Sequence, residues 1–454
     1  MSDWSGRRLH FVGIGGAGMS GLALVCHGLG AAVTGSDRAG SSYMERLRGA
    51  GLEPAVVHDT ANLPADAEVV VSTAIPDGNP ELALARERGQ AVLHRGELLA
   101  ELCGEKRLIA VAGAHGKTTT AAMLAWALRS LGADPAFFVG GEVPGLGPGG
   151  EAVNAGWGAG EWVVAEADES DASFLRLRPE VAVVTNVELD HHARWGSLGE
   201  LRAAFAEFVA PAAAVALPAD GSLAELGEGK RVESFDADRP GPPELRLAVP
   251  GAHNLRNARA ALAGIELWAT STARGTVDVA HDGLVEATAG ALGEFSGVRR
   301  RLELKGTCRD ARIYDDYAHH PTAVRAALEA LREIGPRRLV AVFQPHLYSR
   351  TKALAEQFGA ALSLADEVVV LDVYPAREEP VGELAGVRGL LVAEATAERA
   401  GGKPVWWVPE RDRAAVALIP RLGEGDVLVT IGAGDVFELA DELVDGREGE
   451  RERA

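Results

Sequence analysis

Short runs of apolar residues alternate with longer amphipathic segments along most of the chain. Several runs are apolar at nearly every position, which is typical of parallel strands buried on both faces. Buried helices are the alternative, but runs of about five residues rich in β-branched side chains are short for helices. Glycine or polar residues separate each run from a helix-length segment, so the pattern predicts βα units in an α/β fold. The runs form three blocks: LHFVGIGG, AAVTGSD, EVVVSTA and AVLH; LIAVAG, WVVAEAD and VAVVTN; LVAVFQ, VVVLD, PVWWV and VLVTIGAG.

Three segments depart from this alternation. Residues 141–160 hold eight glycines and two prolines, too many for the interior of a helix or strand, and are expected to form a mobile surface loop. The tail 446–454 is a mixed charge run that is expected to fray. A helix capped by Asn254 is expected because apolar residues follow at helical spacing: Leu255, Ala258, Leu262, Ile265 and Ala269.

Length, charge and cysteine content narrow the class of protein. The chain of 454 residues is too long for one hydrophobic core, and three domains are expected. Its net charge of −20 would repel nucleic acid over most of the surface. The widely spaced Cys26, Cys103 and Cys308 argue against a disulfide framework or a structural zinc site and suit a reducing cytoplasm. Prolines break the longest apolar stretch, residues 209–219, and no signal peptide is evident, so no membrane span is expected.

A first glycine-rich loop follows the first predicted strand. Gly13, Gly15 and Gly18 form G-x-G-x-x-G before a helix, and Asp37 ends the second predicted strand. Such glycines let the backbone approach a diphosphate at a helix N-terminus, while the acid can accept hydrogen bonds from a ribose. The pattern predicts NAD, a flavin or another diphosphate ligand.

A second loop, GAHGKTTT at 113–120, follows the first strand of the second block. Only two residues separate Gly113 from Gly116 where the standard phosphate loop has four. The loop amides can still surround a phosphate, Lys117 can bridge the outer phosphates, and Thr118 can offer its hydroxyl to Mg²⁺. The alternative is a plain turn with a solvated lysine.

Acidic residues follow the next two predicted strands. Four carboxylates fall within six residues, and their mutual repulsion indicates a cation or basic substrate nearby: Glu166, Asp168, Glu169 and Asp171. Asp190, His191 and His192 follow the next strand. Because the carboxyl ends of these strands meet at the edge that carries the second loop, we interpret that loop as a site for ATP with Mg²⁺. The first loop would then hold a substrate.

Seven motifs in this order resemble those of the Mur ligase family: HFVGIGGAGMSG, GAHGKTTT, EADESDASF, HNLRNA, DDYAHHPT, FQPHLYSRT and DVYPAREEP. They run from residue 10 to about 380, nearly the whole chain. The resemblance implies three domains: a Rossmann-like domain for a UDP-sugar (1–105), a central P-loop-type ATPase domain with a mostly parallel sheet (106–295) and a C-terminal Rossmann-like domain that closes over both (296–454).

The resemblance also implies roles for individual residues. Those expected to act in catalysis are Lys117, Glu166, His191 and Arg301, with Thr118, Glu166 and His191 at the magnesium. Those expected to bind ATP are Gly113, Ala114, His115, Gly116, Lys117, Thr118, Thr119, His253, Asn254, Asn257, Arg301 and Asp316. Those expected to bind the UDP-sugar are Gly15, Gly16, Ala17, Gly18, Met19, Ser20, Asp37, Ser72, Thr73 and Ala74. Those expected at the amino acid and in domain closure are His319, His346, Arg350, Tyr374 and Glu378.

Three positions depart from the family pattern. Ala193 stands where relatives often have an acid that supports the magnesium histidine. Phe205 falls near the position at which several sister ligases carry a carbamylated lysine, so none is expected here. Ala114 replaces a threonine that is common in the second loop.

The implied activity is closest to that of the family members that join L-alanine to the lactoyl carboxylate of UDP-N-acetylmuramate, with ATP and Mg²⁺, in peptidoglycan synthesis. An acyl phosphate would be the intermediate. One alternative is a member of the same family that ligates a preformed peptide. The others are an NAD-dependent oxidoreductase, which leaves the second loop unexplained, and a non-catalytic nucleotide-binding module. Neither a nucleic acid nor a membrane is an expected partner, and the sequence predicts no oligomeric state.

Overall fold

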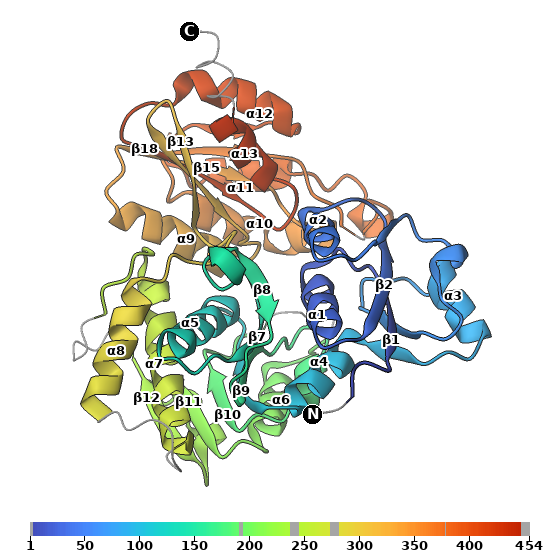
Figure 1. Ribbon diagram of the computed structural model, residues 1–454. Helices are drawn as coiled ribbons and strands as arrows, with labels where there is room; N and C mark the ends of the chain where they lie inside the picture. Colours follow the sequence, from blue (N-terminus) through green and yellow to red (C-terminus); the bar gives the residue numbers. More distant parts are fainter. Residues whose placement is uncertain (1–2, 190–193, 237–244, 273–280, 377, 446–454) are drawn as a thin grey trace. The chain divides into compact units, whose positions relative to one another are not determined.

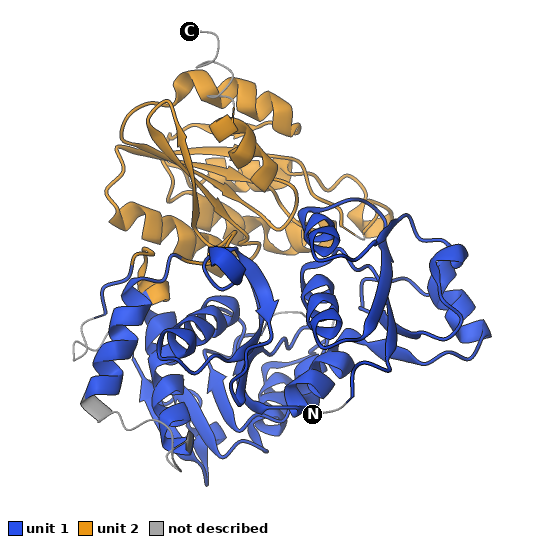
Figure 2. Cartoon of the chain, viewed as in Figure 1, with its two compact units in different colours: residues 1–247, 255–296 blue, residues 248–254, 297–454 orange. Residues whose placement is uncertain are grey.

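The computed structural model describes residues 3–189, 194–236, 245–272, 281–376 and 378–445, and it contains three sheets with helices between the strands (Figure 1). The chain divides into two compact units: residues 1–247 with 255–296, and residues 248–254 with 297–454 (Figure 2). The first unit carries two of the sheets and the second carries one. The predicted α/β fold is confirmed. The three domain boundaries stay predictions.

The first sheet is parallel, with the strand order β3-β2-β1-β4-β5. Its helices begin where side chains can cap them: Ser41 caps α2, and Asn79 caps α3 just before a proline. The strands are β1 (Arg8–Val12), β2 (Ala32–Asp37), β3 (Ala55–Val56), β4 (Glu68–Val71) and β5 (Val92–His94). The helices are α1 (Ala17–Gly28), α2 (Ser42–Gly49), η1 (Thr60–Asn62), α3 (Pro80–Glu87) and α4 (Arg95–Gly104).

The second sheet has the order β12-β11-β10-β6-β9-β7-β8, and only the β7–β8 pair is antiparallel among the described strands. The strands are β6 (Arg107–Ala112), β7 (Ala136–Val143), β8 (Val153–Gly156), β9 (Trp162–Glu166), β10 (Val181–Val184), β11 (Ala214–Pro218) and β12 (Arg231–Phe235). The helices are α5 (Lys117–Ser130), η2 (Pro148–Gly150), η3 (Ser173–Arg176), α6 (Leu198–Val209), η4 (Ala224–Gly227), α7 (Ala252–Thr272) and α8 (His281–Gly293).

The expectation of a mobile surface loop over residues 141–160 is wrong. The segment contains the end of β7 and all of β8, and Val143 and Asn154 in it are buried. Its glycines serve two other purposes. Gly145 has a positive φ of 86° in the turn between the strands, and Gly156 lies where a Cβ would be 2.7 Å from the ring of Phe137.

The third sheet, in the second unit, has the order β13-β14-β18-β15-β16-β17 and is parallel except for the β13–β14 pair. The strands are β13 (Glu303–Cys308), β14 (Ala311–Asp316), β15 (Arg338–Phe343), β16 (Glu367–Val370), β17 (Val405–Trp407) and β18 (Asp426–Ile431). The helices are α9 (Pro321–Glu333), α10 (Tyr348–Leu362), η5 (Gly382–Leu384), α11 (Leu390–Ala397), α12 (Arg411–Leu418), η6 (Ile419–Arg421) and α13 (Phe437–Asp445).

The helix predicted from Asn254 is α7, which begins two residues earlier at Ala252. Asn254 therefore lies in its first turn rather than at its cap. Its side-chain amide donates to the carbonyl of Pro250 at 2.7 Å. The predicted apolar stripe faces inward, since Ala258, Leu262 and Ile265 are buried. The predicted fraying of residues 446–454 concerns a segment outside the described residues.

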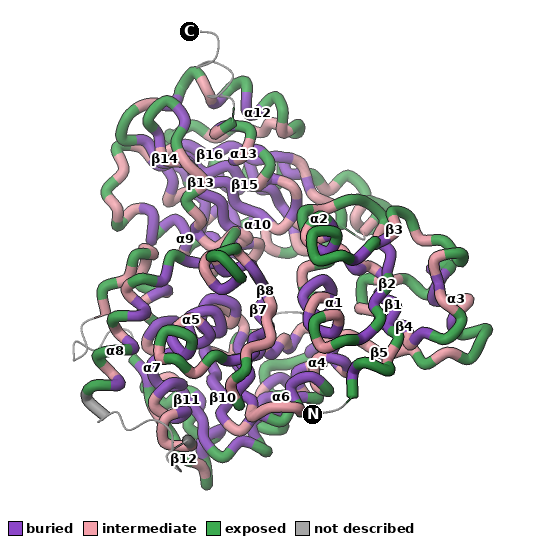
Figure 3. The backbone as a smooth tube through the Cα atoms, in the orientation of Figure 1, coloured by how far each residue is buried: buried purple, intermediate pink, exposed green. Residues whose placement is uncertain are grey.

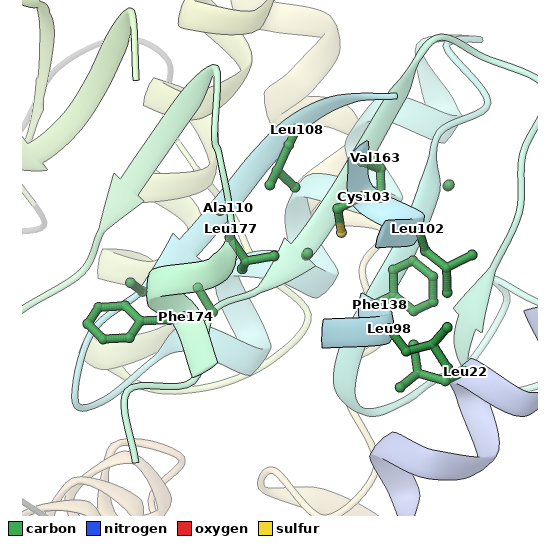
Figure 4. Close-up of a cluster of buried hydrophobic side chains, with 14 of the residues drawn as sticks. Leu22, Leu98, Leu102, Cys103, Leu108, Ala110, Phe138, Val163, Phe174 and Leu177 are labelled. Carbon is green, nitrogen blue, oxygen red and sulfur yellow. The ribbon is translucent and has the colours of Figure 1, made fainter. Parts of the chain in front are cut away.

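Burial of strands on both faces is confirmed, because every residue of β10 and β16 is buried (Figure 3). A single hydrophobic cluster joins the first two sheets. In it Leu22 of α1 lies with Leu98 of α4 and Phe138 of β7 (Figure 4). The three cysteines, all within the described residues, are buried and form no disulfide. No helix in the described part of the chain is long and apolar enough to cross a membrane.

Candidate active site

The loop between β6 and α5 has no space for side chains at its two glycines. Gly113 has a φ of 140°, and a Cβ there would overlap the hydroxyl of Thr185. Gly116 has a φ of 83°, and a Cβ there would overlap the side-chain oxygen of Asn257. Both the backbone conformation and the close neighbours therefore require glycine. Asn257, predicted to act at the ATP, does lie against this loop.

Thr185 and Asn186, directly after β10, hold the same loop by its His115 peptide group. The amide of His115 donates to the side-chain oxygen of Asn186 at 3.0 Å. Its carbonyl accepts from the Thr185 hydroxyl at 2.6 Å and from the Asn186 side-chain amide at 2.9 Å. The sequence analysis missed both residues. The available signal was a polar Thr-Asn pair at the carboxyl end of a buried strand.

Lys117, the first residue of α5, is held by two acceptors. Its Nζ donates to the carbonyl of Gly113 at 2.7 Å and lies 2.9 Å from the carboxylate of Glu169, which is 2% exposed. Burial alone would lower the pKa of Lys117, but the carboxylates of Glu169, Asp168 and Glu166 outweigh it and raise that pKa. The lysine is therefore a buried, charged ammonium at the N-terminus of α5.

Thr118 and Glu166, both predicted at the magnesium, are in contact. The Thr118 hydroxyl donates to one carboxylate oxygen of Glu166 at 3.0 Å, and the amide of Gly140 donates to the other at 2.7 Å. A hydroxyl and a carboxylate are hard oxygen donors of the kind that Mg²⁺ takes. No group of three acidic, histidine or cysteine side chains that could hold a metal occurs in the described ranges. His191, the third predicted magnesium residue, lies outside them.

The cations expected beside the four clustered carboxylates come partly from the chain itself. Lys117 pairs with Glu169, as described above. Arg95, the first residue of α4, donates from Nη2 to Asp168 at 3.3 Å and to Asp171 at 3.2 Å. Together with the other charges and hydrogen bonds around it, Lys117 lowers the pKa of Asp168 despite burial, which alone would raise it. Arg95, 73 residues before Asp168, was not predicted.

The first glycine loop is held by residues at the end of β2. The amides of Gly13 and Ile14 donate to the carbonyl of Ser36 at 2.8 and 3.0 Å, and the amide of Gly15 donates to the Asp37 carboxylate at 2.8 Å. Asp37, predicted to accept hydrogen bonds from a ribose, thus also fixes the backbone of the first glycine loop.

The other residues predicted at the UDP-sugar surround the start of α1. Gly16 precedes this helix and gives it no side-chain cap, so the first amides keep their donors for an anion. Ala17 and Gly18 form the first turn, while Met19 and Ser20 are buried behind it. The predicted segment Ser72, Thr73 and Ala74 follows β4. The Cδ1 of the next residue, Ile75, lies 3.0 Å from the point that a Cβ on Gly13 would occupy.

In the second unit, three predicted residues of the amino-acid group lie together. The rings of His346 and Tyr374 stack at 5.8 Å and 12°, and the ring of His319 lies 6.0 Å from that of His346. Burial, followed by the positive charge of Arg350, lowers the pKa of His319 to about 3. Glu378 accepts from the amide and hydroxyl of Ser349 at 2.9 and 2.5 Å, one residue before Arg350.

Arg301 and Asp316, predicted at the ATP, are also close in the second unit. The Asp316 carboxylate accepts from the amides of Leu302 and Ala318 at 2.8 and 2.7 Å, so it fixes the backbone beside Arg301. The guanidinium of Arg301 lies 5.4 Å from the centre of the Tyr317 ring. The predicted contact of Asp316 with a nucleotide ribose stays a prediction.

Three further predicted ATP residues and the departures from the family pattern are placed as follows. Thr119 is buried in the first turn of α5, and His253 and Asn254 lie in the first turn of α7. Phe205 is fully buried, with its ring 5.4 Å from that of Phe174, so it belongs to the core. Ala114 lies in the second loop, and Ala193 is outside the described residues.

Three family models match consecutive parts of the chain. They are described as "Mur ligase family, catalytic domain" at residues 8–107, "Mur ligase middle domain" at 111–225 and "Mur ligase, glutamate ligase domain" at 300–434. Together they reach all three sheets, although β12 of the second sheet lies outside the matched ranges. The three consecutive matches agree with the three-domain architecture that the sequence motifs predict.

Curated relatives and solved structures match along almost the whole chain. UDP-N-acetylmuramate--L-alanine ligases from Kineococcus radiotolerans and Renibacterium salmoninarum are 46% and 42% identical, each over 96% of this chain and 95% of the relative. The structure of a UDP-N-acetylmuramate-alanine ligase from Thermotoga maritima matches with a TM-score of 0.80 and 30% identity over 98% of this chain and 99% of that one. A murein peptide ligase from Psychrobacter arcticus matches with a TM-score of 0.69 and 25% identity over 97% and 98%.

Proposed function

This chain belongs to the Mur ligase family, and we propose that it joins L-alanine to the lactoyl carboxylate of UDP-N-acetylmuramate, with conversion of ATP to ADP and phosphate. This reaction supplies a peptidoglycan precursor. The observation that carries the proposal is the loop at the start of α5, where a buried charged lysine and a hydroxyl–carboxylate pair lie side by side. Relatives with this activity align with nearly the full chain.

The second loop holds the ATP in this proposal. Its amides and the Lys117 ammonium meet the phosphates, and the Thr118 hydroxyl with the Glu166 carboxylate would hold Mg²⁺, together with His191 by the family pattern. When bound, the metal neutralises charge that develops on the phosphates. That Arg301 acts on the ATP phosphates is a prediction from the family pattern alone.

The reaction proceeds in two steps. An oxygen of the lactoyl carboxylate attacks the γ-phosphorus of ATP, the bond to the β-phosphate oxygen breaks, and an acyl phosphate and ADP form. The neutral amine of L-alanine then attacks the acyl carbon, loses a proton, and the tetrahedral oxyanion collapses with release of phosphate. Activation is needed because a free carboxylate is a poor electrophile. Lys117 stabilises the charge on the transferring phosphoryl group.

The amino acid is held in the C-terminal domain in this proposal. His346, Tyr374 and His319 provide a compact aromatic wall, and Arg350 beside them can meet a carboxylate. The low pKa of His319 keeps its ring neutral at physiological pH, so it does not repel the incoming amine as a cation would.

A preformed peptide is the second candidate acceptor, because the murein peptide ligase from Psychrobacter arcticus shares the fold over 97% of this chain. The alanine enzyme from Thermotoga maritima agrees better in both TM-score and identity, which favours a single amino acid. An NAD-dependent oxidoreductase is not supported, since the curated relatives that align with nearly the full chain are ligases. The predicted cytoplasmic location stays a prediction.

The test is ADP release by the purified protein with UDP-N-acetylmuramate, Mg²⁺ and one acceptor at a time. We expect release with L-alanine and little with other amino acids or with a tripeptide. ADP release that requires the tripeptide and not L-alanine would show that the protein ligates a preformed peptide. Product mass then identifies the new amide bond.

A further inference from the structure

Arg95 lies between the first glycine loop and the acidic segment that follows β9. It begins α4, directly after β5, and the next turns of that helix are anchored in the core by Leu98 and Leu102 (Figure 4). Both leucines are fully buried. A side chain on such a rigid helix start can be aimed accurately, as binding sites require.

Two aspartates orient one half of the Arg95 guanidinium. Nη2 meets Asp168 and Asp171 at 3.3 and 3.2 Å. Each aspartate is itself fixed: Asp168 accepts from the amide and hydroxyl of Ser170, and Asp171 accepts from the amide of Ser173. The side-chain exposure of Asp171 is only 8%. The plane of the guanidinium is therefore set before any ligand arrives.

The other half of the guanidinium faces the first glycine loop. Its Nη1 lies 3.2 Å from the point that a Cβ on Gly18 would occupy. Within the described residues, neither Nη1 nor Nε donates a hydrogen bond, and 27% of the side chain is exposed. Nη1 therefore lies beside the start of α1, whose cap Gly16 offers no side chain.

We propose that Arg95 is a further substrate-binding residue, whose Nη1 donates to the diphosphate of the UDP-sugar in the first glycine loop; this rests on the proposed function. A hydrogen bond from a guanidinium N–H to a phosphate oxygen is charge-assisted and therefore strong. The α1 amides meet the same diphosphate from the other side. A side chain on Gly18 would press on the guanidinium, because its Cβ would lie only 3.2 Å from Nη1.

A purely structural role would give a different result. In that case Arg95 would act only as the counter-ion of Asp168 and Asp171, and its removal would harm the acidic segment that also carries Glu169. The harm would then appear in ATP kinetics, and removing one aspartate charge as well would repair it.

The experiment compares Arg95→Ala, Arg95→Lys and the double variant Arg95→Ala/Asp171→Asn. Calorimetry with UDP alone measures diphosphate binding, and steady-state assays measure KM for UDP-N-acetylmuramate and for ATP. We expect Arg95→Ala to weaken UDP binding and raise KM for UDP-N-acetylmuramate by about 10- to 100-fold, with KM for ATP unchanged. The double variant should stay equally impaired, and Arg95→Lys should recover only part of the affinity.

Arg176→Ala is the matched control. Arg176 pairs with Glu97 on the same first turn of α4 and is 50% exposed, and its removal should leave UDP binding unchanged. Normal UDP binding by Arg95→Ala, or recovery in the double variant, would overturn the assignment. Failure of the proposed function would look different: the unaltered protein would release no ADP with L-alanine, while the calorimetric comparison would still report on Arg95.

Discussion

The ammonium of Lys117 lies 2.9 Å from the carboxylate of Glu169, inside the loop that we assign to ATP. Glu169 is buried, the Lys117 side chain is only 11% exposed, and the lysine also donates to the carbonyl of Gly113. The pair keeps a charged lysine in a buried position before a nucleotide arrives. A triphosphate must therefore compete with Glu169 for the same ammonium, so the pair influences both the stability of the loop and the affinity for ATP.

Replacing Lys117 by Met should reduce ADP release by at least about 100- to 1,000-fold, because a cation at the transferring phosphoryl group is lost. It should also destabilise the fold by about 3–5 kcal/mol, since Glu169 is left as an unpaired buried charge. The double variant Lys117→Met/Glu169→Gln should regain most of the thermal stability but none of the activity. Thermal unfolding and ADP release measure the two effects. Substantial activity in either variant would show that ATP does not bind at this loop.

Replacing Glu166 by Gln should raise the Mg²⁺ concentration needed for half-maximal ADP release by about 10- to 100-fold. The amide keeps one oxygen for the Thr118 hydroxyl but loses the negative charge that suits a hard cation. A magnesium titration at saturating substrates measures the change. Glu161→Gln is the control, because this exposed residue directly precedes β9, at the opposite end of the strand from Glu166. An unchanged magnesium requirement in Glu166→Gln would exclude Glu166 as a ligand.

The sequence was sufficient for the continuously apolar strands and for the loops that follow them, but it did not predict β3, β7, β8, β11, β12, β13 and β14. Runs such as residues 181–184 are buried on both faces, and that burial is what makes them continuously apolar. In a parallel sheet the residues after such strands share one edge. The meeting of Thr118 with Glu166 could therefore be predicted from two separate strand ends.

Contacts between distant segments could not be predicted in this way. Arg95 meets Asp168 and Asp171 across 73 and 76 residues, and no local pattern marks an arginine at a helix start as their partner. Glycine is ambiguous for a related reason. It permits both turns and close packing, and at Gly156 it makes room for the Phe137 ring inside a strand pair where a loop was expected.

Replacing Gly434 by Ala should raise KM for L-alanine by about tenfold and leave KM for ATP unchanged. A Cβ there would lie 2.6 Å from the Tyr374 ring and would also overlap the side-chain oxygen of Gln344, so the ring must leave its stack on His346. Gly423→Ala is the control, since a Cβ at that position meets only the end of the Arg337 side chain at 3.5 Å. A normal KM for L-alanine in Gly434→Ala would show that Tyr374 does not belong to the amino-acid site.

Glu81 gives a prediction about pH, because it is a fully buried carboxylate with several donors. It accepts from the Ser36 hydroxyl at 2.5 Å, the Asn62 side chain at 2.9 Å and the amide of Asp59 at 3.1 Å, and the His10 ring lies at 3.4 Å. Burial alone would raise the pKa of Glu81, but these hydrogen bonds outweigh it and lower that pKa to about 2. Since Ser36 also accepts from the first glycine loop, Glu81 supports the proposed UDP-sugar site from behind.

A folded-state pKa below the unfolded value means that Glu81 stabilises the fold above about pH 4.5, and that this stabilisation is lost as the pH falls toward 2. Replacing Glu81 by Gln should therefore lower the free energy of unfolding at pH 7 by on the order of 3 kcal/mol. The difference from the unaltered protein should shrink to less than half when urea unfolding is repeated at pH 3. Asp77→Asn, a carboxylate 90% exposed, should change neither value. A penalty for Glu81→Gln that is equal at both pH values would mean that shape, and not the buried charge, is what the network requires.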